Sequence, residues 1–294
     1  MAIKTIAVLG AGQMGSGIAQ IAASKGYKVV LRDIKQEFCD NALVKMRAGL
    51  EKRVAAGKTT QEAVEATMAN ITTTVDLSGV KDCDMVIEAA PEILDLKRNT
   101  FKELGEIVRE DCILCTNTSS MSITEIMSEC KNPERCAGMH FFFPVMAMKL
   151  VEVIRGQKTT DATVAAVYEV SAGMGKTAVE CKTDTPGFIV NRCLFAFMLE
   201  AVHCYEEGVA SVADIDTAIK LGLNHPMGPF ELNDMSGLEL GLSGLETLYK
   251  RFAEERWKPM PEVYERVEKG EYGRKTGKGW YDYSDGEKKP RNDL

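Results

Sequence analysis

The 294-residue chain is long enough for two domains with buried cores, and its 45% hydrophobic and 27% charged residues are typical of a globular protein. The formal net charge of −7 argues against nucleic acid or an anionic membrane surface as the main partner. No apolar stretch approaches the roughly 18 residues of a membrane span, and an apolar run already begins at Ile3. We therefore expect no nucleic-acid partner, no membrane partner and no secretory leader.

Nine cysteines are scattered along the chain without the spacing of a disulfide framework. This pattern is typical of a reducing compartment, so we expect a cytoplasmic protein. Cys112 and Cys115 form a lone CxxC at the start of an apolar run, with no second pair and no nearby histidine. Simple packing is favoured over zinc binding or redox chemistry, and we expect no metal site.

A nucleotide-binding pattern occupies the first 33 residues. The apolar run Ile3–Leu9 leads into Gly10-Ala11-Gly12-Gln13-Met14-Gly15, and a segment with helical periodicity follows from Ser16 to Lys25. Gly10 suits a tight turn, Gly12 close approach to a pyrophosphate, and Gly15 close packing of helix on strand. The N-terminus of the helix would face the phosphates. Strand, glycine turn and helix together predict a dinucleotide site.

Asp33 lies just after the second β-run, Lys28–Leu31. Its distance from the glycine turn is about that expected for an acidic residue that binds the ribose. Its carboxylate would accept hydrogen bonds from a ribose 2′-hydroxyl and would repel a 2′-phosphate. Arg32 could hold such a phosphate, but neighbouring strand residues point to opposite faces. NAD is therefore favoured over NADP.

Alternating strand and helix patterns continue up to residue 154 and predict a parallel, doubly wound sheet. Thr59 with Glu62, and Ser122 with Glu125, have the spacing of capping boxes. The helical region after Asp33 carries five basic residues, which indicate either a solvated helix face or a wall for a phosphorylated substrate: Lys45, Arg47, Lys52, Arg53 and Lys58. The expected helices cover residues 38–56 and 95–109, and the expected strands are 71–75, 85–89, 113–116, 137–144 and 149–154.

Several polar residues fall where a ligand of such a sheet would bind. Asn117 and Ser119 follow a strand, and ligands lie beyond the carboxyl ends of strands in this architecture. His140 lies inside an apolar run, and Glu152 shares one strand face with aliphatic residues. An unpaired buried carboxylate is costly, so we expect Glu152 to pair with His140. Such a pair beside a nicotinamide has the chemistry of a hydroxyl dehydrogenase.

The composition changes near Asp184, which predicts a Rossmann-type NAD-binding domain over residues 1–184 and an all-α domain over residues 185–294. The segment Phe188–Glu206 is apolar nearly all round and should be a buried helix, inside which Asn191 is conspicuous. A helical domain of this kind is a plausible unit for a homodimer or larger homo-oligomer. The basic, glycine-rich segment Gly273–Gly279 lacks the flanking strand and helix of a phosphate loop and is interpreted as a surface turn.

These motifs together closely resemble the L-3-hydroxyacyl-CoA dehydrogenase family, in order and over essentially the whole chain. Within the family, the chain is most similar to the bacterial group acting on 3-hydroxybutyryl-CoA. The segments that carry the resemblance are Gly10–Gly15, Asn117–Ser120, Met139–Phe142, Lys149–Val153, Pro186–Arg192, His225–Pro229 and Gly273–Gly279.

The resemblance implies a role for each matching residue. His140 would be the catalytic base and Glu152 its partner, while Ser119 and Asn191 would bind the C3 oxygen and thioester region of the substrate. Lys52 falls where the family places a lysine on the phosphates of CoA. The remaining matches would surround the NAD: Gly10, Gly12, Gln13, Met14, Gly15, Asp33, Glu92, Lys97 and Asn117.

One departure concerns the catalytic strand, where Phe143 replaces the asparagine usual in the family. This difference concerns the details of substrate binding more than the reaction. The expected reaction is the NAD-dependent interconversion of an L-3-hydroxyacyl-CoA, of short chain such as 3-hydroxybutyryl-CoA, and its 3-ketoacyl-CoA. Two alternatives stay open: a dehydrogenase of a free hydroxy acid such as L-gulonate, and a catalytically silent NAD-binding protein of the same fold.

Overall fold

A computed structural model of the chain describes residues 3–291 and divides into two compact units, with the division between Phe188 and Ile189. This division falls just after the composition change at Asp184. Each unit is described by itself below.

The first unit is built on an eight-stranded sheet with the strand order β3-β2-β1-β4-β5-β6-β7-β8. All neighbouring strands are parallel except β6 and β7, which are antiparallel. The predicted doubly wound sheet is thus confirmed, with one antiparallel pair and a final strand, β8, that the sequence analysis did not predict. The strands are β1 Thr5–Leu9, β2 Lys28–Arg32, β3 Ile71–Thr74, β4 Met85–Glu88, β5 Ile113–Thr116, β6 Cys136–Phe141, β7 Leu150–Ile154 and β8 Thr177–Cys181.

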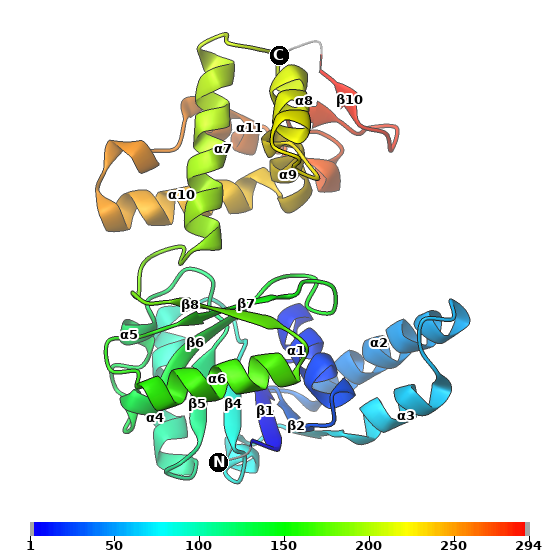
Figure 1. Ribbon diagram of the computed structural model, residues 1–294, viewed down its shortest axis with the longest axis vertical. Coiled ribbons are helices and arrows are strands. Elements are labelled where there is room, and N and C mark those ends of the chain that lie inside the picture. The colour runs from blue at the N-terminus through cyan, green and yellow to red at the C-terminus, as the bar shows by residue number, and fades with distance from the viewer. Residues whose placement is uncertain (1–2, 292–294) are drawn as a thin grey trace. The chain divides into compact units, whose positions relative to one another are not determined.

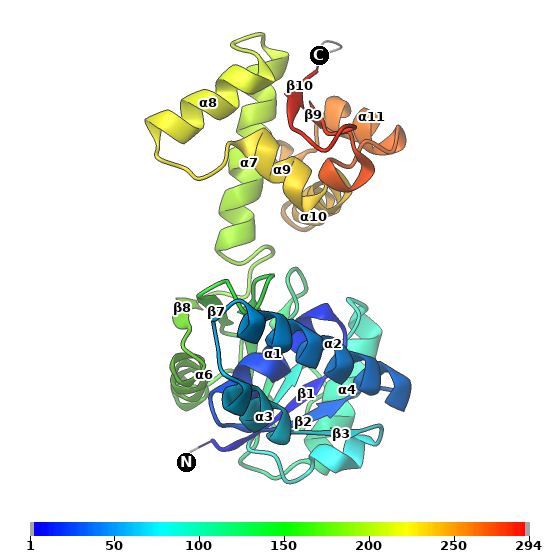
Figure 2. The same cartoon turned by 90° about the vertical axis from the view of Figure 1, so that its right-hand side faces the viewer.

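Helices cover both faces of this sheet (Figures 1 and 2). Ile6 and Val8 of β1 face a core shared with α1 and α6, whereas Ala7 and Leu9 face a core shared with α4 and α5. Both faces are buried, which explains why the central strands are continuous apolar runs rather than alternating ones. The helices are α1 Gln13–Ser24, α2 Gln36–Ala55, α3 Gln61–Ala69, α4 Leu94–Ile107, α5 Ile123–Ile126 and α6 Asp161–Gly173, with short 3₁₀ turns η1 Leu77–Val80 and η2 Pro133–Arg135.

Two predicted helix caps have different outcomes. The hydroxyl of Ser122 accepts a hydrogen bond from the Glu125 N–H, as its capping-box spacing predicts. The cap of α3 is Thr60 and not Thr59, because the Thr60 hydroxyl accepts from the Ala63 N–H at 3.3 Å. Adjacent threonines offer the same chemistry, so only the backbone geometry selects between them.

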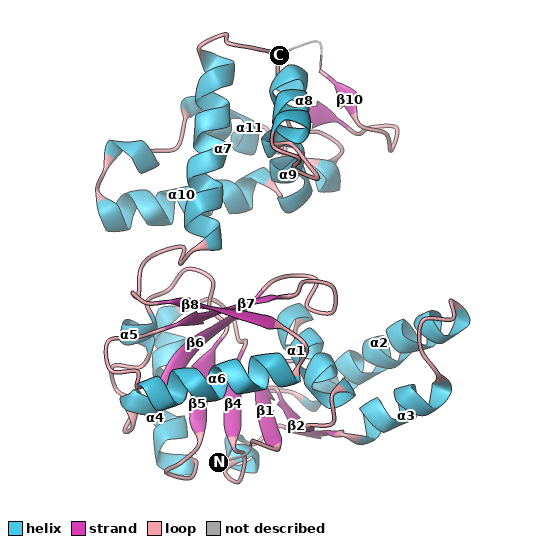
Figure 3. Ribbon diagram, in the orientation of Figure 1, coloured by secondary structure: helices cyan, strands magenta, loops and turns pink. Residues whose placement is uncertain are grey.

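The second unit is mainly helical, and Figure 3 shows the small β9–β10 pair beside its helices. The all-α prediction is therefore confirmed in its main feature and corrected for this pair. The elements are α7 Val190–Glu206, α8 Val212–Gly222, α9 Pro229–Ser236, α10 Leu238–Phe252, η3 Glu255–Trp257, α11 Pro261–Glu268, η4 Arg274–Thr276, β9 Tyr281–Asp282 and β10 Lys289–Pro290.

Helix α7 is less buried than its composition predicts. Its buried residues are Met198, Leu199, Ala201 and Val202, all in its second half, and Asn191 is half-buried. The prediction of a buried helix therefore holds for the second half of α7 and is wrong for its first half in the single chain.

The glycine-rich segment Gly273–Gly279 wraps closely around the buried Asp234. A Cβ atom on Gly273 would lie 2.3 Å from the carbonyl oxygen of Asp234, and one on Gly279 would lie 2.1 Å from its carboxylate. That carboxylate accepts hydrogen bonds from the backbone N–H groups of Trp280 and Tyr281. Burial raises the pKa of Asp234 to about 6. The glycines therefore serve close packing, and the interpretation as a turn rather than a phosphate loop is supported.

Within residues 3–291, no helix is long and apolar enough to cross a bilayer, and no group of His, Cys, Asp and Glu side chains is arranged to hold a metal ion. The nine cysteines are all free thiols, and both Cys112 and Cys115 are buried.

Candidate active site

The glycine turn after β1 is the first element of the site. Gly10 has a φ of 103°, and a Cβ atom there would lie 2.5 Å from the carbonyl oxygen of Ala89. A Cβ on Gly15 would lie 1.8 Å from the Gly10 carbonyl oxygen, whereas a Cβ on Gly12 would meet nothing within 4 Å. Gly10 and Gly15 therefore close the turn against the protein, while Gly12 leaves open space for a ligand. Gly12 is also the N-cap residue of α1. Because glycine has no side chain, the first N–H groups of that helix have no side-chain acceptor.

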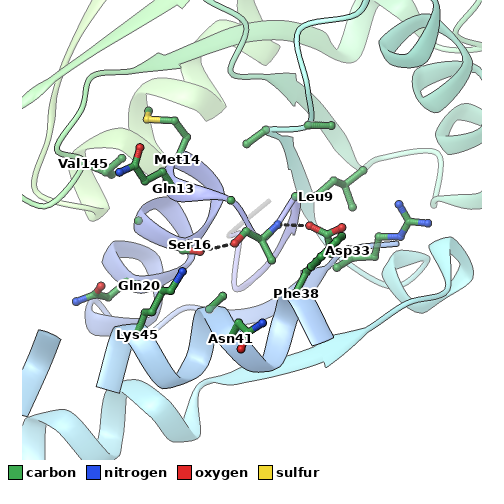
Figure 4. A pocket seen from close by; sticks show the side chains of 18 of the residues that line it. Leu9, Gln13, Met14, Ser16, Gln20, Asp33, Phe38, Asn41, Lys45 and Val145 are labelled. Atoms are coloured by element: carbon green, nitrogen blue, oxygen red, sulfur yellow. Dashed lines mark hydrogen bonds between the residues drawn. The ribbon is translucent and has the colours of Figure 1, made fainter. Parts of the chain in front are cut away.

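A cavity of about 920 Å³ opens beside this turn, and Figure 4 shows side chains that line it. Asp33 stands on one wall, where its carboxylate accepts from the N–H groups of Ala11 at 2.6 Å and Ile34 at 2.7 Å. Arg32 also lines the cavity, but its Nε donates to the carbonyl of Val75 at 3.1 Å. The fixed carboxylate therefore stands where a ribose hydroxyl would bind.

Helix α2 forms the facing wall of the cavity with the side chains of Phe38, Asn41 and Lys45 (Figure 4). The sequence analysis treated Lys45 only as one of five basic residues and did not single out Phe38 or Asn41. The spacing of these three residues places them on one face of a helix. The sequence does not show that this face points to the cavity.

His140 and Glu152 form a buried pair across the antiparallel strands β6 and β7. The two residues are opposite each other in register, and His140 Nδ1 lies 2.7 Å from Glu152 Oε2. Only 5% of His140 and 1% of Glu152 are exposed. The imidazole also contacts the rings of Phe142 and Phe188, with centroid distances of 4.5 and 5.6 Å. The other ring nitrogen, Nε2, hydrogen bonds to no described residue.

A network at the ends of β4 and β5 fixes the loop that carries Ser119. The Glu92 carboxylate accepts from the Ser119 N–H at 2.9 Å and from the hydroxyl of Thr118. Burial disfavours ionisation of Glu92, but Lys97 and the hydrogen bonds from Thr118 and Ser119 outweigh it and lower the pKa of Glu92. Asn117 accepts from the Phe141 N–H at 2.8 Å, which joins the end of β5 to the strand of His140.

Lys97 is 1% exposed and lies beneath this network. Its ammonium contacts Glu88 Oε1 at 2.7 Å, Glu92 Oε2 at 3.1 Å and the Ala90 carbonyl at 3.2 Å. All three are acceptors within the protein, so the geometry favours support of Glu92 over direct contact with NAD. The sequence analysis missed Glu88, although a glutamate ending the apolar run Met85–Glu88 was a visible signal.

Comparison with known proteins finds one family that matches both units. The family model for the NAD-binding domain of 3-hydroxyacyl-CoA dehydrogenase matches residues 5–185, and the model for the C-terminal domain of the same family matches residues 187–283. The chain belongs to the 3-hydroxyacyl-CoA dehydrogenase family. Its cofactor is NAD, and it is an oxidoreductase.

Individual relatives are similar over nearly their full length. The 3-hydroxybutyryl-CoA dehydrogenase of Clostridioides difficile is 43% identical, and the alignment covers 95% of this chain and 99% of that one. The mitochondrial hydroxyacyl-coenzyme A dehydrogenase of Homo sapiens is 41% identical, covering 96% and 91%. The crystal structure of (S)-3-hydroxybutyryl-CoA dehydrogenase from Ralstonia eutropha is 41% identical with a TM-score of 0.92, covering 96% and 99%.

The residues of the cavity fit the NAD of this family. Gly12 leaves the backbone accessible to a pyrophosphate, α1 presents its uncapped N-terminus, and Asp33 offers a ribose acceptor. Gln13 and Met14 also line the cavity.

The other two predicted substrate residues lie on helices α2 and α7. Lys52 is exposed near the end of α2, does not line the cavity and makes no ion pair with a described residue. Asn191 lies in the first turn of α7, in the second unit. Of the other predicted basic residues, Arg47 is paired with Glu65 at 2.6 Å.

Proposed function

We propose that this protein interconverts L-3-hydroxyacyl-CoA and 3-ketoacyl-CoA with NAD, and that its preferred pair is 3-hydroxybutyryl-CoA and acetoacetyl-CoA. The observation that carries this proposal is the buried His140–Glu152 pair on the strands beside the NAD cavity. The short acyl chain is supported by the relatives named 3-hydroxybutyryl-CoA dehydrogenase at 42–44% identity.

NAD held by the backbone at Gly12, the N-terminus of α1 and Asp33 would supply the acceptor for the hydride that leaves C3 of the substrate. His140 takes the hydroxyl proton at Nε2 while its Nδ1–H stays bonded to Glu152. The carboxylate fixes the tautomer of the ring and stabilises the imidazolium that forms. In the direction of ketone reduction, His140 starts protonated and returns the proton to the C3 oxygen.

Ser119 and Asn191 are proposed to bind the substrate around C3 and the thioester. A hydroxyl and a side-chain amide are suitable donors for these oxygens. The Glu92–Ser119 hydrogen bond supports a fixed position for Ser119. Glu92, Lys97 and Asn117 are proposed to maintain this part of the NAD site, with Lys97 acting through Glu92.

Lys52 is proposed to bind the phosphates of CoA. Its ammonium is exposed and unpaired among the described residues, which leaves it available to an anionic ligand. Lys81 is a matched control, because it is also exposed but immediately precedes the loop into β4, at the amino end of the strands.

A homodimer or larger homo-oligomer formed through the helical unit is also proposed. Support comes from large apolar side chains on its surface, since Leu221 is 81% exposed and Leu240 is 62% exposed. Sedimentation of the wild type and of Leu221→Glu would test this.

The free cysteines support a reducing compartment, and the cytoplasm is proposed.

The deciding experiment measures NADH oxidation with acetoacetyl-CoA, longer 3-ketoacyl-CoA esters, free acetoacetate and L-gulonate-type acids in the matching direction. We expect the highest kcat/KM with acetoacetyl-CoA and little activity without CoA. Lys52→Ala should raise KM for the CoA ester, whereas Lys81→Ala should not. Higher activity on a free hydroxy acid would refute the CoA assignment, and no turnover with any substrate would favour a silent NAD-binding protein.

A further inference from the structure

Lys176 is a buried lysine without an acidic partner. It lies between α6 and β8, is 8% exposed, and contacts no carboxylate of a described residue. Its ammonium donates to the backbone carbonyls of Val145 and Met148, the latter at 2.7 Å. Burial lowers the pKa of Lys176. A buried cation is costly, so an ammonium held only by two carbonyls suggests that holding those carbonyls is its role.

Both carbonyls belong to the loop that joins β6 to β7, here called the hairpin loop, residues 142–149. This loop folds on itself, because the N–H groups of Ala147 and Met148 both donate to the Pro144 carbonyl, at 2.9 and 3.0 Å. Val145 is 3% exposed and packs on α1, where a Cβ atom on Gly17 would lie 2.8 Å from the Val145 Cβ. The hairpin loop is thus held by Lys176 on one side and pressed against α1 on the other.

The hairpin loop is also a wall of the NAD cavity, which Phe143, Pro144, Val145 and Met146 line. Figure 4 shows Val145 near Gln13 and Met14, on the opposite side of the cavity from Asp33. In the sheet order, β2 with Asp33 lies on one side of β1, and β4, β5 and β6 lie on the other. A dinucleotide crosses such a sheet at this point, with its two halves on opposite sides. If Asp33 binds the adenosine ribose, the hairpin loop lies on the nicotinamide side.

We propose that Lys176 is a positioning residue that holds the hairpin loop as the wall of the nicotinamide half of the NAD site. The same loop connects the strand of His140 to the strand of Glu152, so its position also affects the alignment of the pair with the nicotinamide. This inference rests on the proposed function for the location of the nicotinamide.

A comparison of two nucleotides separates this role from a purely structural one. ADP-ribose contains the adenosine half and the pyrophosphate but lacks the nicotinamide. Lys176→Met removes the ammonium while keeping an unbranched side chain of similar length. The control is Lys182→Met, because Lys182 is exposed just beyond the other end of β8.

We expect Lys176→Met to weaken NADH binding by about tenfold, as the loss of hydrogen bonds from a charged donor would. ADP-ribose affinity should change by less than about twofold, because the substitution lies far from the adenosine half of the site and distant sites affect each other little. Lys176→Arg should restore most of the NADH affinity because its guanidinium can also donate to both carbonyls. Lys182→Met should leave both affinities unchanged. Binding is measured by titration of the folded wild type and variants, with melting temperatures on the same preparations.

Equal weakening of NADH and ADP-ribose would overturn the proposal, as would a lowered melting temperature with unchanged NADH affinity. If Lys176→Met does not fold, the same comparison on Lys176→Gln decides, since the amide keeps one polar donor group. Failure of this proposal is distinct from failure of the proposed function, because the wild-type assay on acetoacetyl-CoA does not depend on the variants.

Discussion

Replacing Glu152 with glutamine removes the negative charge beside His140 and keeps the size of the side chain. Strand β7 should pack as before, since Glu152 is 1% exposed and glutamine fills the same volume. The carbonyl oxygen of the amide can still accept from His140 Nδ1. What changes is the electrostatic stabilisation of the imidazolium.

The magnitude follows from the short contact between the two side chains. The Nδ1–Oε2 distance of 2.7 Å identifies a charge-assisted hydrogen bond. Such bonds contribute about 1.5–3 kcal/mol, and two unit charges about 4 Å apart interact by about 4 kcal/mol at an effective dielectric constant of about 20. The imidazolium should therefore lose about 1.5–4 kcal/mol. This corresponds to a fall in kcat of about 10- to 1000-fold.

The assay is the pH dependence of kcat for acetoacetyl-CoA reduction, with the melting temperature and NADH affinity of the same preparation. Reduction needs protonated His140, and a weaker imidazolium loses its proton at lower pH, so the optimum should move to lower pH. NADH affinity should change little. Glu180→Gln is a matched control, because Glu180 lies on the adjacent strand β8 and accepts from Arg155 instead of a histidine.

The reasoning would be refuted by a destabilised Glu152→Gln protein whose pH profile and turnover per folded molecule match the wild type. Glu152 would then only satisfy the core. A pH shift of the same size in Glu180→Gln would equally show that the effect is general and not specific to the pair.

Four further predictions follow from single contacts. His140→Ala should lower kcat by about 10²–10⁴-fold with NADH affinity retained in a titration, and near-normal kcat would remove His140 from the mechanism. Asp33→Ala should lower the ratio of the Kd for NADPH to the Kd for NADH by about tenfold or more, because a ribose acceptor and a charge that repels the 2′-phosphate disappear together. A wild type that prefers NADPH would contradict this role of Asp33. Lys97→Met should cost about 3–5 kcal/mol in urea unfolding because Glu88 stays buried without its cation, and a loss below about 1 kcal/mol would contradict the network. Asp234 has a folded-state pKa of about 6 against an ordinary value of 3.8, so it binds its proton more tightly in the folded protein; its contribution is largest at acid pH and disappears as the pH rises through about 6. Relative to Asp234→Asn, the wild type should gain about 2 kcal/mol of unfolding free energy between about pH 7 and about pH 4.5, and a difference that does not vary with pH would refute this pKa.

The sequence by itself determined the features that depend on local spacing. The glycines of the Gly10–Gly15 turn and the carboxylate of Asp33 belong to one strand–turn–helix–strand unit, whose geometry follows from residues close together in the chain. The His140–Glu152 pair was also predictable. A carboxylate in an apolar strand needs a hydrogen-bonding partner, and the neighbouring strands contain few polar side chains that could serve as one. The Ser122 cap was correct for the same local reason.

The tertiary structure decided the features that depend on residues distant in sequence. Thr60 rather than Thr59 caps α3 because the chain path between two packed helices selects one of two equivalent side chains. The antiparallel register that sets His140 opposite Glu152 depends on the hairpin loop, which is held by Lys176 from a later part of the chain. Even between residues close in sequence the folded backbone decides the contacts: Lys97, which the family resemblance places at the NAD, contacts three acceptors that the connection from β4 to α4 brings to one buried point. Whether a charged side chain faces a ligand or a buried partner depends on how the folded chain packs around it, and spacing along the chain does not specify that packing.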